Sequence, residues 1–422
     1  MAIGDVKKVV ELPQGAWFGD DILTLPFPPD WDISVCKMAG HDAPPVTDEE
    51  IRKAFANPIG TKTISELAKG KKEVVIVVDD ITRATPTAPI IPYVLEEIHK
   101  AGITKEHTRF IMATGAHKTP TREDWVKKVG EEIVAEYMMY NHNVYDHFVD
   151  LGTTSRGTPV KINREFMECD LKIAVGGCKF HAFAGFGGGG KIILPGVAAM
   201  ETIIYNHEVV SKRYRDPTVG MGKVVENVVR LDMEEAARMA GLDVKVDIVF
   251  NNRREPVRVF VGDVVAEYRE AHKFARGFYK TEPYTDADIV VVNTYPMEDE
   301  QTVGIWAANA SVRRGGDVVM IVQSVEGQIH HYVYGQFGTR YGGRGWTPPS
   351  RRDPVPKAEK VYVFTEYPWK RDQVDLGRAK KISYHTKWDE IIDKLQEKHG
   401  DEAKVAIYPY AAIQIPPLPE EW

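Results

Sequence analysis

The chain has 422 residues, 43% of them hydrophobic and 27% charged, so composition indicates an ordinary globular protein and length indicates two domains. A formal net charge of −7 argues against a nucleic-acid-binding protein, and it allows an anionic substrate only where positive charge gathers locally. The first residues lack the apolar core of a signal peptide, and no stretch approaches the roughly 18–20 apolar residues of a membrane span. Three cysteines without CxxC spacing suggest neither a disulfide framework nor a zinc site. We therefore expect a cytoplasmic protein.

Apolar runs alternate with helical segments along the chain, which predicts an α/β fold with mainly parallel sheets. The expected strands lie at 73–78, 108–114, 171–176, 244–250, 288–294, 316–323 and 360–364. Helices are expected from about Ile90 through Lys100 and over 264–280, and the Gly- and Arg-rich segment 335–352 is expected to be a long loop.

Two α/β domains are predicted, with the boundary near 273–284 and the active site in the cleft between them. Residues 1–275 would form the N-terminal domain and 285–398 a smaller C-terminal domain. The tail 399–422 is expected to pack back on the first domain.

Two polar segments follow predicted strands, and ligands of parallel sheets bind at the carboxyl ends of strands. The first, DDITRATP at 79–86, offers Asp80 and Arg83 as groups of opposite charge; the alternative is a helix cap with a surface ion pair. The second, ATGAHKTP at 113–120, places His117 at the mouth of the sheet. An imidazole there can exchange protons near neutral pH, although a lone histidine is often a surface or capping residue.

The stretch GFGGGGK at 185–191 resembles a phosphate-binding P-loop, in which Gly-Lys is followed by Ser or Thr. Here Ile192 lacks the hydroxyl that binds magnesium, and Pro195 stops the helix that a P-loop needs after its lysine. The predicted strand also ends near Gly176, well before the first glycine. A P-loop kinase is therefore excluded.

The glycines at 187–190 would let the backbone approach a bulky ligand closely. A desolvated lysine can act as a nucleophile, so Lys191 is a candidate for covalent or electrostatic attachment. His181 and His207 flank this lysine and could supply a general base and a metal ligand. A flexible loop between core elements is the alternative.

Together DDITRATP, TGAHKTP and HAFAGFGGGGKIILPG…NHE resemble the lactate racemase family of nickel-pincer enzymes, over nearly the whole chain. The resemblance implies a nickel-pincer nucleotide cofactor, pyridinium-3-thioamide-5-thiocarboxylic acid mononucleotide, with Lys191 as its covalent tether and His207 as a nickel ligand. His117 and His181 would be the paired acid/base groups on opposite faces of C2 of a 2-hydroxy acid. The implied reaction is inversion of C2 by proton-coupled hydride transfer.

The resemblance further implies that Arg83 holds the substrate carboxylate and that Asp80 lies near the cofactor, with Gly187, Gly188, Gly189 and Gly190 around it. The resemblance also implies that cofactor-biosynthesis enzymes are partners of the protein. Neither a nucleic acid nor a membrane is expected as a partner.

The sequence departs from this family in the second domain. Where lactate racemases carry a Gln and a substrate-binding Lys after an aromatic pair, this chain has Ala307 and Ala310. A 2-hydroxy acid larger than lactate is therefore expected. Gln301, Trp306 and Asn309 are predicted to shape its pocket, together with Arg313 or the pair His330-His331 as further candidates. The alternative function is a nucleotide- or sugar-acid-binding protein of the same fold that neither racemises nor carries nickel.

Overall fold

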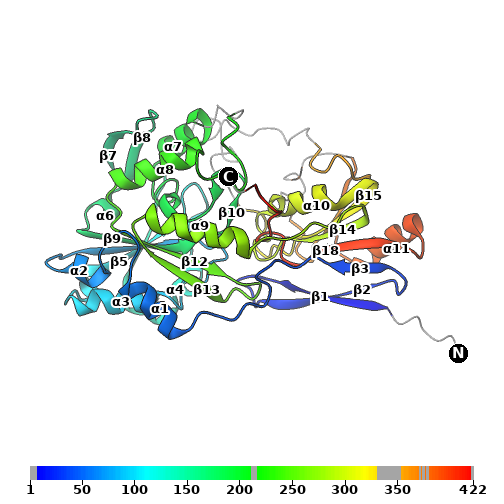
Figure 1. Cartoon of the computed structure of the whole chain (residues 1–422), viewed down its shortest axis with the longest axis horizontal. Coiled ribbons are helices and arrows are strands. Elements are labelled where there is room, and N and C mark those ends of the chain that lie inside the picture. Colours follow the sequence, from blue (N-terminus) through cyan, green and yellow to red (C-terminus); the bar gives the residue numbers. More distant parts are fainter. Residues whose placement is uncertain are drawn as a thin grey trace. The chain divides into compact units, whose positions relative to one another are not determined.

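The chain divides into two compact units (Figure 1). The residue ranges that form each unit differ from those of the expected domains. One unit contains Asp42–Phe278, and the other contains the N-terminal segment up to His41 together with Tyr279–Ile329 and the segment that ends at Pro417. This computed structural model describes residues 7–210, 216–329, 353–369, 372, 376 and 380–419. The predicted loop at 335–352 and the pair His330-His331 lie outside the described residues.

The Asp42–Phe278 unit contains a six-stranded sheet whose central strands are parallel. In spatial order its strands are β13 (Pro256–Gly262), β12 (Val244–Phe250), β9 (Leu171–Gly177), β4 (Val74–Asp79), β5 (Thr108–Ala113) and β6 (Met138–Asn141). Only the pair β12–β13 is antiparallel within this described sheet. The predicted strands at 73–78, 108–114, 171–176 and 244–250 are confirmed to within a residue.

Both faces of this sheet are covered, which explains why β4 is a continuous apolar run. Val75 and Val77 belong to one core cluster and Val74, Ile76 and Val78 to another. Side chains alternate between the faces of a strand, so a strand covered on both sides needs apolar residues at successive positions.

The two clusters are completed by different helices, on opposite sides of the sheet (Figure 1). One side carries α1 (Asp48–Ala56), α2 (Ile64–Ala68) and α3 (Ile91–Lys100); the other carries α7 (Met200–Ile204) and α8 (Val228–Met239). The remaining helices of this unit are α4 (Arg122–Val129), α5 (Glu131–Glu136), α6 (Arg164–Met167) and α9 (Ala266–Phe278). Two short antiparallel pairs are β7 (Phe148–Thr153) with β8 (Pro159–Asn163) and β10 (Phe180–His181) with β11 (Gly185–Phe186).

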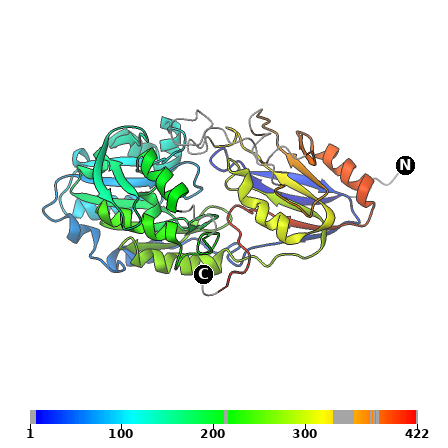
Figure 2. The ribbon, with the colours of Figure 1, turned by 90° about the horizontal axis from the view of Figure 1, so that it is seen from above.

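The second unit contains another six-stranded sheet, in which every described pairing is parallel. Its spatial order is β17 (Ile382–His385), β16 (Lys360–Phe364), β15 (Val312–Ile321), β14 (Ala287–Asn293), β18 (Lys404–Tyr408) and β3 (Asp32–Val35). Helix α10 (Ile305–Ser311) packs on one face, while α11 (Trp388–His399) packs on the other beside the hairpin of β1 (Lys8–Gln14) and β2 (Asp21–Phe27) (Figure 2).

The N-terminal segment and the C-terminal tail therefore do not belong to the domains in which they were expected. The N-terminal segment does not join the domain at 1–275, because β3 pairs with β18 in the sheet of the second unit. The tail does not simply pack back on the first domain either, because β18 lies at the interior of that same sheet. From Leu418 on, the described tail is grouped with the Asp42–Phe278 unit, where Leu418 lies against Gly222. The chain passes between the units at Phe278–Tyr279, within the expected 273–284.

None of the described helices is long and apolar enough to cross a membrane.

Candidate active site

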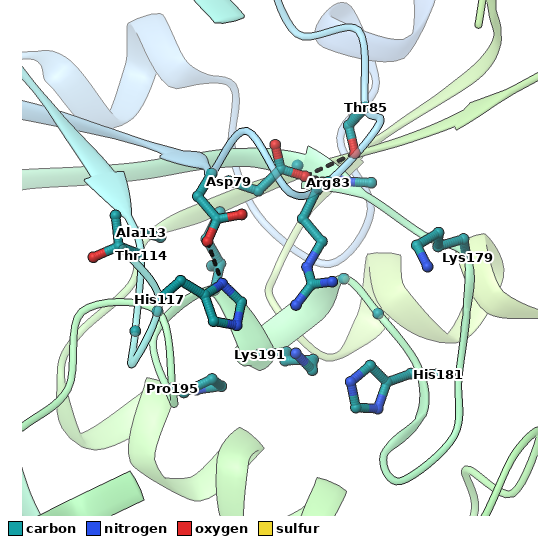
Figure 3. Close-up of a pocket in the computed structure, with 18 of the residues that line it drawn as sticks. Asp79, Arg83, Thr85, Ala113, Thr114, His117, Lys179, His181, Lys191 and Pro195 are labelled. Atoms are coloured by element: carbon teal, nitrogen blue, oxygen red, sulfur yellow. Dashed lines mark hydrogen bonds and ion pairs between the residues drawn. The ribbon is translucent and has the colours of Figure 1, made fainter. Parts of the chain in front are cut away.

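A pocket of about 650 Å³ opens at the carboxyl ends of β4, β5 and β9, and all of its lining residues belong to the Asp42–Phe278 unit (Figure 3). It collects side chains from the three motifs: Asp80 and Arg83, then His117, then His181 and Lys191. Figure 3 shows His117, Arg83, Lys191 and His181 converging on one space. The sequence motifs therefore meet where ligands of parallel sheets bind.

Positive charge is concentrated in this pocket although the whole chain is acidic. The lining includes four basic side chains, Arg83, Lys179, Lys191 and Lys245, against the carboxylates of Asp79 and Asp80. Both carboxylates have cationic or imidazole partners, as described below. This local excess of positive charge can attract an anionic substrate, even though the whole chain has a net charge of −7.

The loop after β4 is held by Asp79. Its carboxylate accepts hydrogen bonds from Thr85 Oγ1 at 2.7 Å and from the Gly177 amide at 3.2 Å, and it pairs with Lys128 Nζ at 2.7 Å. The fully buried Lys128 also donates to the carbonyls of Arg83 at 2.8 Å and Thr85 at 3.1 Å. Lys128 thus fixes the backbone that carries Arg83. Sequence reasoning missed this residue because a lysine in helix α4 has no local signature.

Asp80 pairs with His117 inside the pocket wall. The Asp80 Oδ2 to His117 Nδ1 distance is 2.5 Å, and Asp80 Oδ1 accepts from the Thr82 amide at 3.0 Å. Burial raises the pKa of Asp80, but the positive charges of His117 and Arg83 and the hydrogen bonds outweigh it, so the pKa lies well below its usual range. A carboxylate at Nδ1 requires His117 to carry a proton on that nitrogen, which leaves Nε2 as a proton acceptor.

His181 is held in the opposite tautomer. Its Nδ1 lies 3.2 Å from the Phe183 amide and 3.1 Å from the Ala184 amide, both of which donate to it. Neutral His181 therefore carries its proton on Nε2. Burial lowers the pKa of His181 well below its usual value, and the positive charges of Lys191, Arg83 and Lys179 add to the effect. The pocket thus presents one imidazole as a proton acceptor and the other as a proton donor.

Lys191 lines the pocket from the 3-10 helix η2 (Gly189–Ile192). Of the four glycines expected to surround the cofactor, Gly187 and Gly188 line the pocket. Gly189 and Gly190 are buried away from it, against the ring of Tyr268 and the backbone of Met233. The missing side chains of these last two allow close packing of the loop on α8 and α9, and a role for them around the cofactor stays a prediction.

The glycine-rich loop is fixed from beneath by two buried side chains that sequence reasoning missed. The guanidinium of Arg230 donates to the carbonyls of Gly188 at 2.8 Å and Ala184 at 3.3 Å, and to that of Phe186. Asp247 accepts from the Gly189 amide at 2.8 Å and pairs with Lys245 at 2.6 Å. The regular elements in this loop are short, the two-residue strand β11 and the 3-10 helix η2, so these side-chain contacts fix the rest of its shape.

His207 lies in a π-helical turn, η3 (Tyr205–Val210), and stacks on Phe183 with ring centroids 5.3 Å apart. Its Nδ1 is 3.1 Å from the Ile203 carbonyl, so Nδ1–H donates and Nε2 keeps a lone pair. Burial, together with the positive charge of Lys191, lowers the pKa of His207 to about 3. A neutral imidazole with one nitrogen oriented by a carbonyl is a good metal ligand. No group of three or more potential metal-binding side chains occurs among the described residues.

The predicted substrate residues of the second domain lie in the other unit. Gln301 is buried in the 3-10 helix η4 (Gln301–Gly304) and donates to the Asp372 carbonyl at 3.1 Å. On α10, Trp306 donates to the Ala411 carbonyl at 3.4 Å, and Asn309 donates to the Pro354 carbonyl at 2.9 Å. None of the three lines the pocket around Lys191.

The comparisons with known proteins agree with the three motifs. Residues 18–218 match the family model described as the lactate racemase N-terminal domain. The chain is 33% identical over 289 residues to lactate racemase of Lactiplantibacillus plantarum, and 30% identical over 287 residues to that of Thermoanaerobacterium thermosaccharolyticum. Each alignment covers 66% of this chain and 66% of the relative.

Similarity of fold extends further than similarity of sequence. The structure of the lactate racemase apoprotein from T. thermosaccharolyticum superposes with a TM-score of 0.74 at 25% identity, covering 97% of this chain and 100% of that one. A protein of Thermotoga maritima shares the fold with a TM-score of 0.64 at 17% identity, over 88% and 99% of the two chains. The chain belongs to the lactate racemase family.

Proposed function

We propose that the protein is a racemase or epimerase that inverts C2 of a 2-hydroxy acid with a nickel-pincer nucleotide attached to Lys191. The observation that carries the proposal is the pairing of His117 and His181 in one pocket in complementary tautomers. In inversion by hydride transfer, the proton that moves is that of the C2 hydroxyl, which is removed on one face of the substrate and restored on the other. A binding protein has no need of two imidazoles arranged in this way.

The residues present fit the cofactor that the family implies. Lys191 would be the tether, and Gly187 and Gly188 line the same pocket beside it. His207 would offer Nε2 to nickel, because its Nδ1–H is engaged by the Ile203 carbonyl. When bound, the nickel-pincer nucleotide would accept a hydride from C2 and return it.

The protein's own groups would move the protons. His117 Nε2 takes the proton of the substrate hydroxyl, and the Asp80 carboxylate stabilises the imidazolium that forms. His181 would serve the oxygen of the planar 2-keto acid on the opposite side through Nε2, and it would have to be an imidazolium to give a proton there, because a neutral imidazole that lost its Nε2 proton would be left as an imidazolate. Reaction of the other enantiomer uses the same two groups in reverse. Arg83 would hold the substrate carboxylate in a bidentate pair, which positions C2 between the imidazoles.

The second unit supports a substrate other than lactate. Ala307 and Ala310 replace the Gln and the substrate-binding Lys that lactate racemases are expected to carry, so a charged contact of that kind is missing at these positions. Roles for Gln301, Trp306 and Asn309 toward the substrate remain predictions.

Chiral chromatography of single enantiomers incubated with the cofactor-loaded protein tests this function. The protein would be produced together with cofactor-biosynthesis enzymes, and a panel of 2-hydroxy acids of increasing size would be supplied. At least one acid should convert to a mixture of stereoisomers at C2. Full cofactor loading without inversion of any acid would favour the alternative, a nucleotide- or sugar-acid-binding protein.

His117→Gln and His181→Gln provide the matched variants. Each should keep the Lys191 adduct, because neither imidazole is needed for attachment, yet each should lower kcat by about 10²–10⁴-fold, the usual contribution of a general acid or base. Retained inversion in the double variant would refute the proposed roles.

A further inference from the structure

A fully buried carboxylate, Asp232 on helix α8, holds the π-helical turn η3 in place. Its Oδ2 accepts hydrogen bonds from Asn206 Nδ2 and from Thr158 Oγ1, both at 2.7 Å. Its Oδ1 accepts from Thr154 Oγ1 at 2.6 Å. Hydrogen bonds to a carboxylate are among the stronger ones in proteins. Asp232 therefore joins three segments of the chain: the turn between β7 and β8, helix α8, and η3.

Asn206 is the member of η3 that reaches this carboxylate. It is 0% exposed, and its Nδ2 also donates to the Val229 carbonyl at 3.3 Å, so the nitrogen end of the amide is identified by two acceptors. Its Oδ1 is buried and has no hydrogen-bond partner among the described residues. A buried carbonyl without a donor costs about 1–3 kcal/mol, so packing alone does not explain an asparagine here. What Asn206 supplies is the donor to Asp232.

The hydrogen bond between Asn206 and Asp232 supports an unusual turn. A π turn contains one residue more than an α turn and is rare, and the extra residue changes the direction in which side chains leave the backbone. A contact must therefore hold the turn against the more usual α form. Asn206 provides it directly before His207, whose Nδ1 then lies 3.1 Å from the Ile203 carbonyl.

Helix α8 also supports the ring on which His207 stacks. Asn227 caps this helix, because its Oδ1 accepts from the amides of Val229 and Arg230, both at 3.1 Å. The Nδ2 of Asn227 donates to the Phe183 carbonyl at 3.0 Å. Phe183 and His207 are stacked, with ring centroids 5.3 Å apart and planes inclined by 24°. The turn that carries His207 and the ring beneath it are thus both fixed to α8.

The imidazole held in this way lies near the candidate active site. After burial, the positive charges of Lys191 and His117 are among the causes that lower the pKa of His207, which places all three groups in one electrostatic environment. Asp232 and Asn206 are not among the residues that line the pocket of Lys191. They can therefore influence chemistry there only through His207.

We propose that Asn206 and Asp232 are positioning residues for His207: the hydrogen bond between them keeps the π turn, and the π turn keeps Nδ1–H on the Ile203 carbonyl and Nε2 as the nitrogen for a metal. The metal role rests on the proposed function. The orientation of His207 is a property of the protein without cofactor, so the two proposals can fail separately.

NMR of the full chain without cofactor, labelled with isotope-enriched histidine, reads this orientation, because ring couplings identify the protonated nitrogen. His207→Gln assigns the signal. Wild-type His207 should be mainly the Nδ1–H tautomer. Asn206→Leu removes the donor at similar volume, and the ratio of the Nδ1–H to the Nε2–H tautomer should fall by about fivefold, the effect of losing one hydrogen bond. Asn206→Ser, whose side chain is shorter, takes its place if thermal unfolding shows that the leucine variant is not folded.

Thr158→Val is the matched control, because it removes a different donor to the same oxygen of Asp232 at the same distance of 2.7 Å. Thr158 lies in the turn between β7 and β8, so this variant should keep the wild-type tautomer of His207. The proposal is overturned if wild-type His207 is not mainly Nδ1–H, if loss of the Asn206 donor leaves the ratio unchanged, or if Thr158→Val changes it as much. The expected NMR result in a protein that inverts no 2-hydroxy acid would support the positioning role and contradict the proposed function alone.

Discussion

Asp80 gives His117 its orientation and its protonation state through the 2.5 Å contact at Nδ1. Asp80→Asn keeps the size of the side chain but removes the charge that stabilises an imidazolium, and its amide favours the wrong tautomer. Inversion should therefore slow by about 10²–10⁴-fold in kcat. Chiral chromatography of the cofactor-loaded variant would measure this. Thr82→Val is the control, since it removes the hydroxyl that donates to the other oxygen of Asp80, and it should have a much smaller effect.

His142 is a second residue with a testable charge state. Burial lowers the pKa of His142 to about 4, although its hydrogen bond with the Ala198 carbonyl opposes the shift. In the unfolded chain the pKa is about 6.5, so between these values the unfolded state binds more protons and stability falls as pH falls. The titration of His142 should lower the free energy of unfolding by about 3 kcal/mol below pH 4 and should have no effect above pH 6.5.

The measurement is the free energy of unfolding of the apoprotein across this pH window, for the wild type and for His142→Gln. The variant should show a shallower decline below pH 6.5. Identical pH profiles would mean that His142 is not buried in its neutral form.

At the scale of the element, the glycine-rich loop that carries Lys191 has two glycines with different roles. At Gly188 an added Cβ would lie 2.4 Å from Asp247 Oδ2, and φ is +81°. At Gly187 the nearest atom would be 3.3 Å away, and the position lines the pocket. Gly188→Ala should therefore destabilise the fold by about 1–3 kcal/mol, whereas Gly187→Ala should fold and lose cofactor loading.

Thermal unfolding and intact-protein mass spectrometry together separate these two effects. Normal loading of Gly187→Ala would show that this glycine does not face the cofactor. Unchanged stability of Gly188→Ala would show that the loop is not held against Asp247 as described.

The loop also depends on Arg230, whose guanidinium reaches three carbonyls and stacks on Tyr268 at 4.2 Å. Arg230→Lys keeps the charge but cannot reproduce the planar fork. We expect a loss of about 2–4 kcal/mol in unfolding free energy, because buried carbonyls lose their donors. Arg238→Lys, at an exposed arginine on the same helix, should change stability little.

Local patterns explain which elements could be predicted. The run at 73–78 predicted β4 to within a residue because residues 74–78 are all buried, on one face of the sheet or the other. The strand expected at 316–323 begins earlier, at Val312, because Gly315 and Gly316 interrupt the apolar pattern while the strand continues through them. The motif residues could be predicted because each follows a recognisable strand.

Long-range contacts explain what could not be predicted. Strand β3 belongs to the second unit through pairing with β18, about 370 residues later in the sequence, and nothing local to 32–35 indicates that partner. Arg230, Asp247 and Lys128 support the site from helices and a strand that carry no motif. Their importance follows from burial and hydrogen bonding, which only the fold reveals.

At the scale of the whole molecule, the N-terminal segment should stabilise the second unit. The segment from β1 to β3 contributes Leu12, Leu25, Phe27 and Trp31 to its core, and β3 covers the edge of β18. Deletion of residues 1–41 should remove hydrogen-exchange protection from β14 and β18 while β4 and β9 stay protected. Equal loss of protection in both sheets would show that the two units do not behave as separate folding units.

Peptide mass spectrometry shows directly whether Lys191 carries the cofactor. The protein and its Lys191→Ala variant would be produced together with cofactor-biosynthesis enzymes, with the T. thermosaccharolyticum lactate racemase as a loading control and Lys161→Ala as a matched surface variant. A mass increase is expected on the peptide that contains Lys191 in the wild type and in Lys161→Ala, and none in Lys191→Ala. An unmodified Lys191, alongside a modified control racemase, would contradict it.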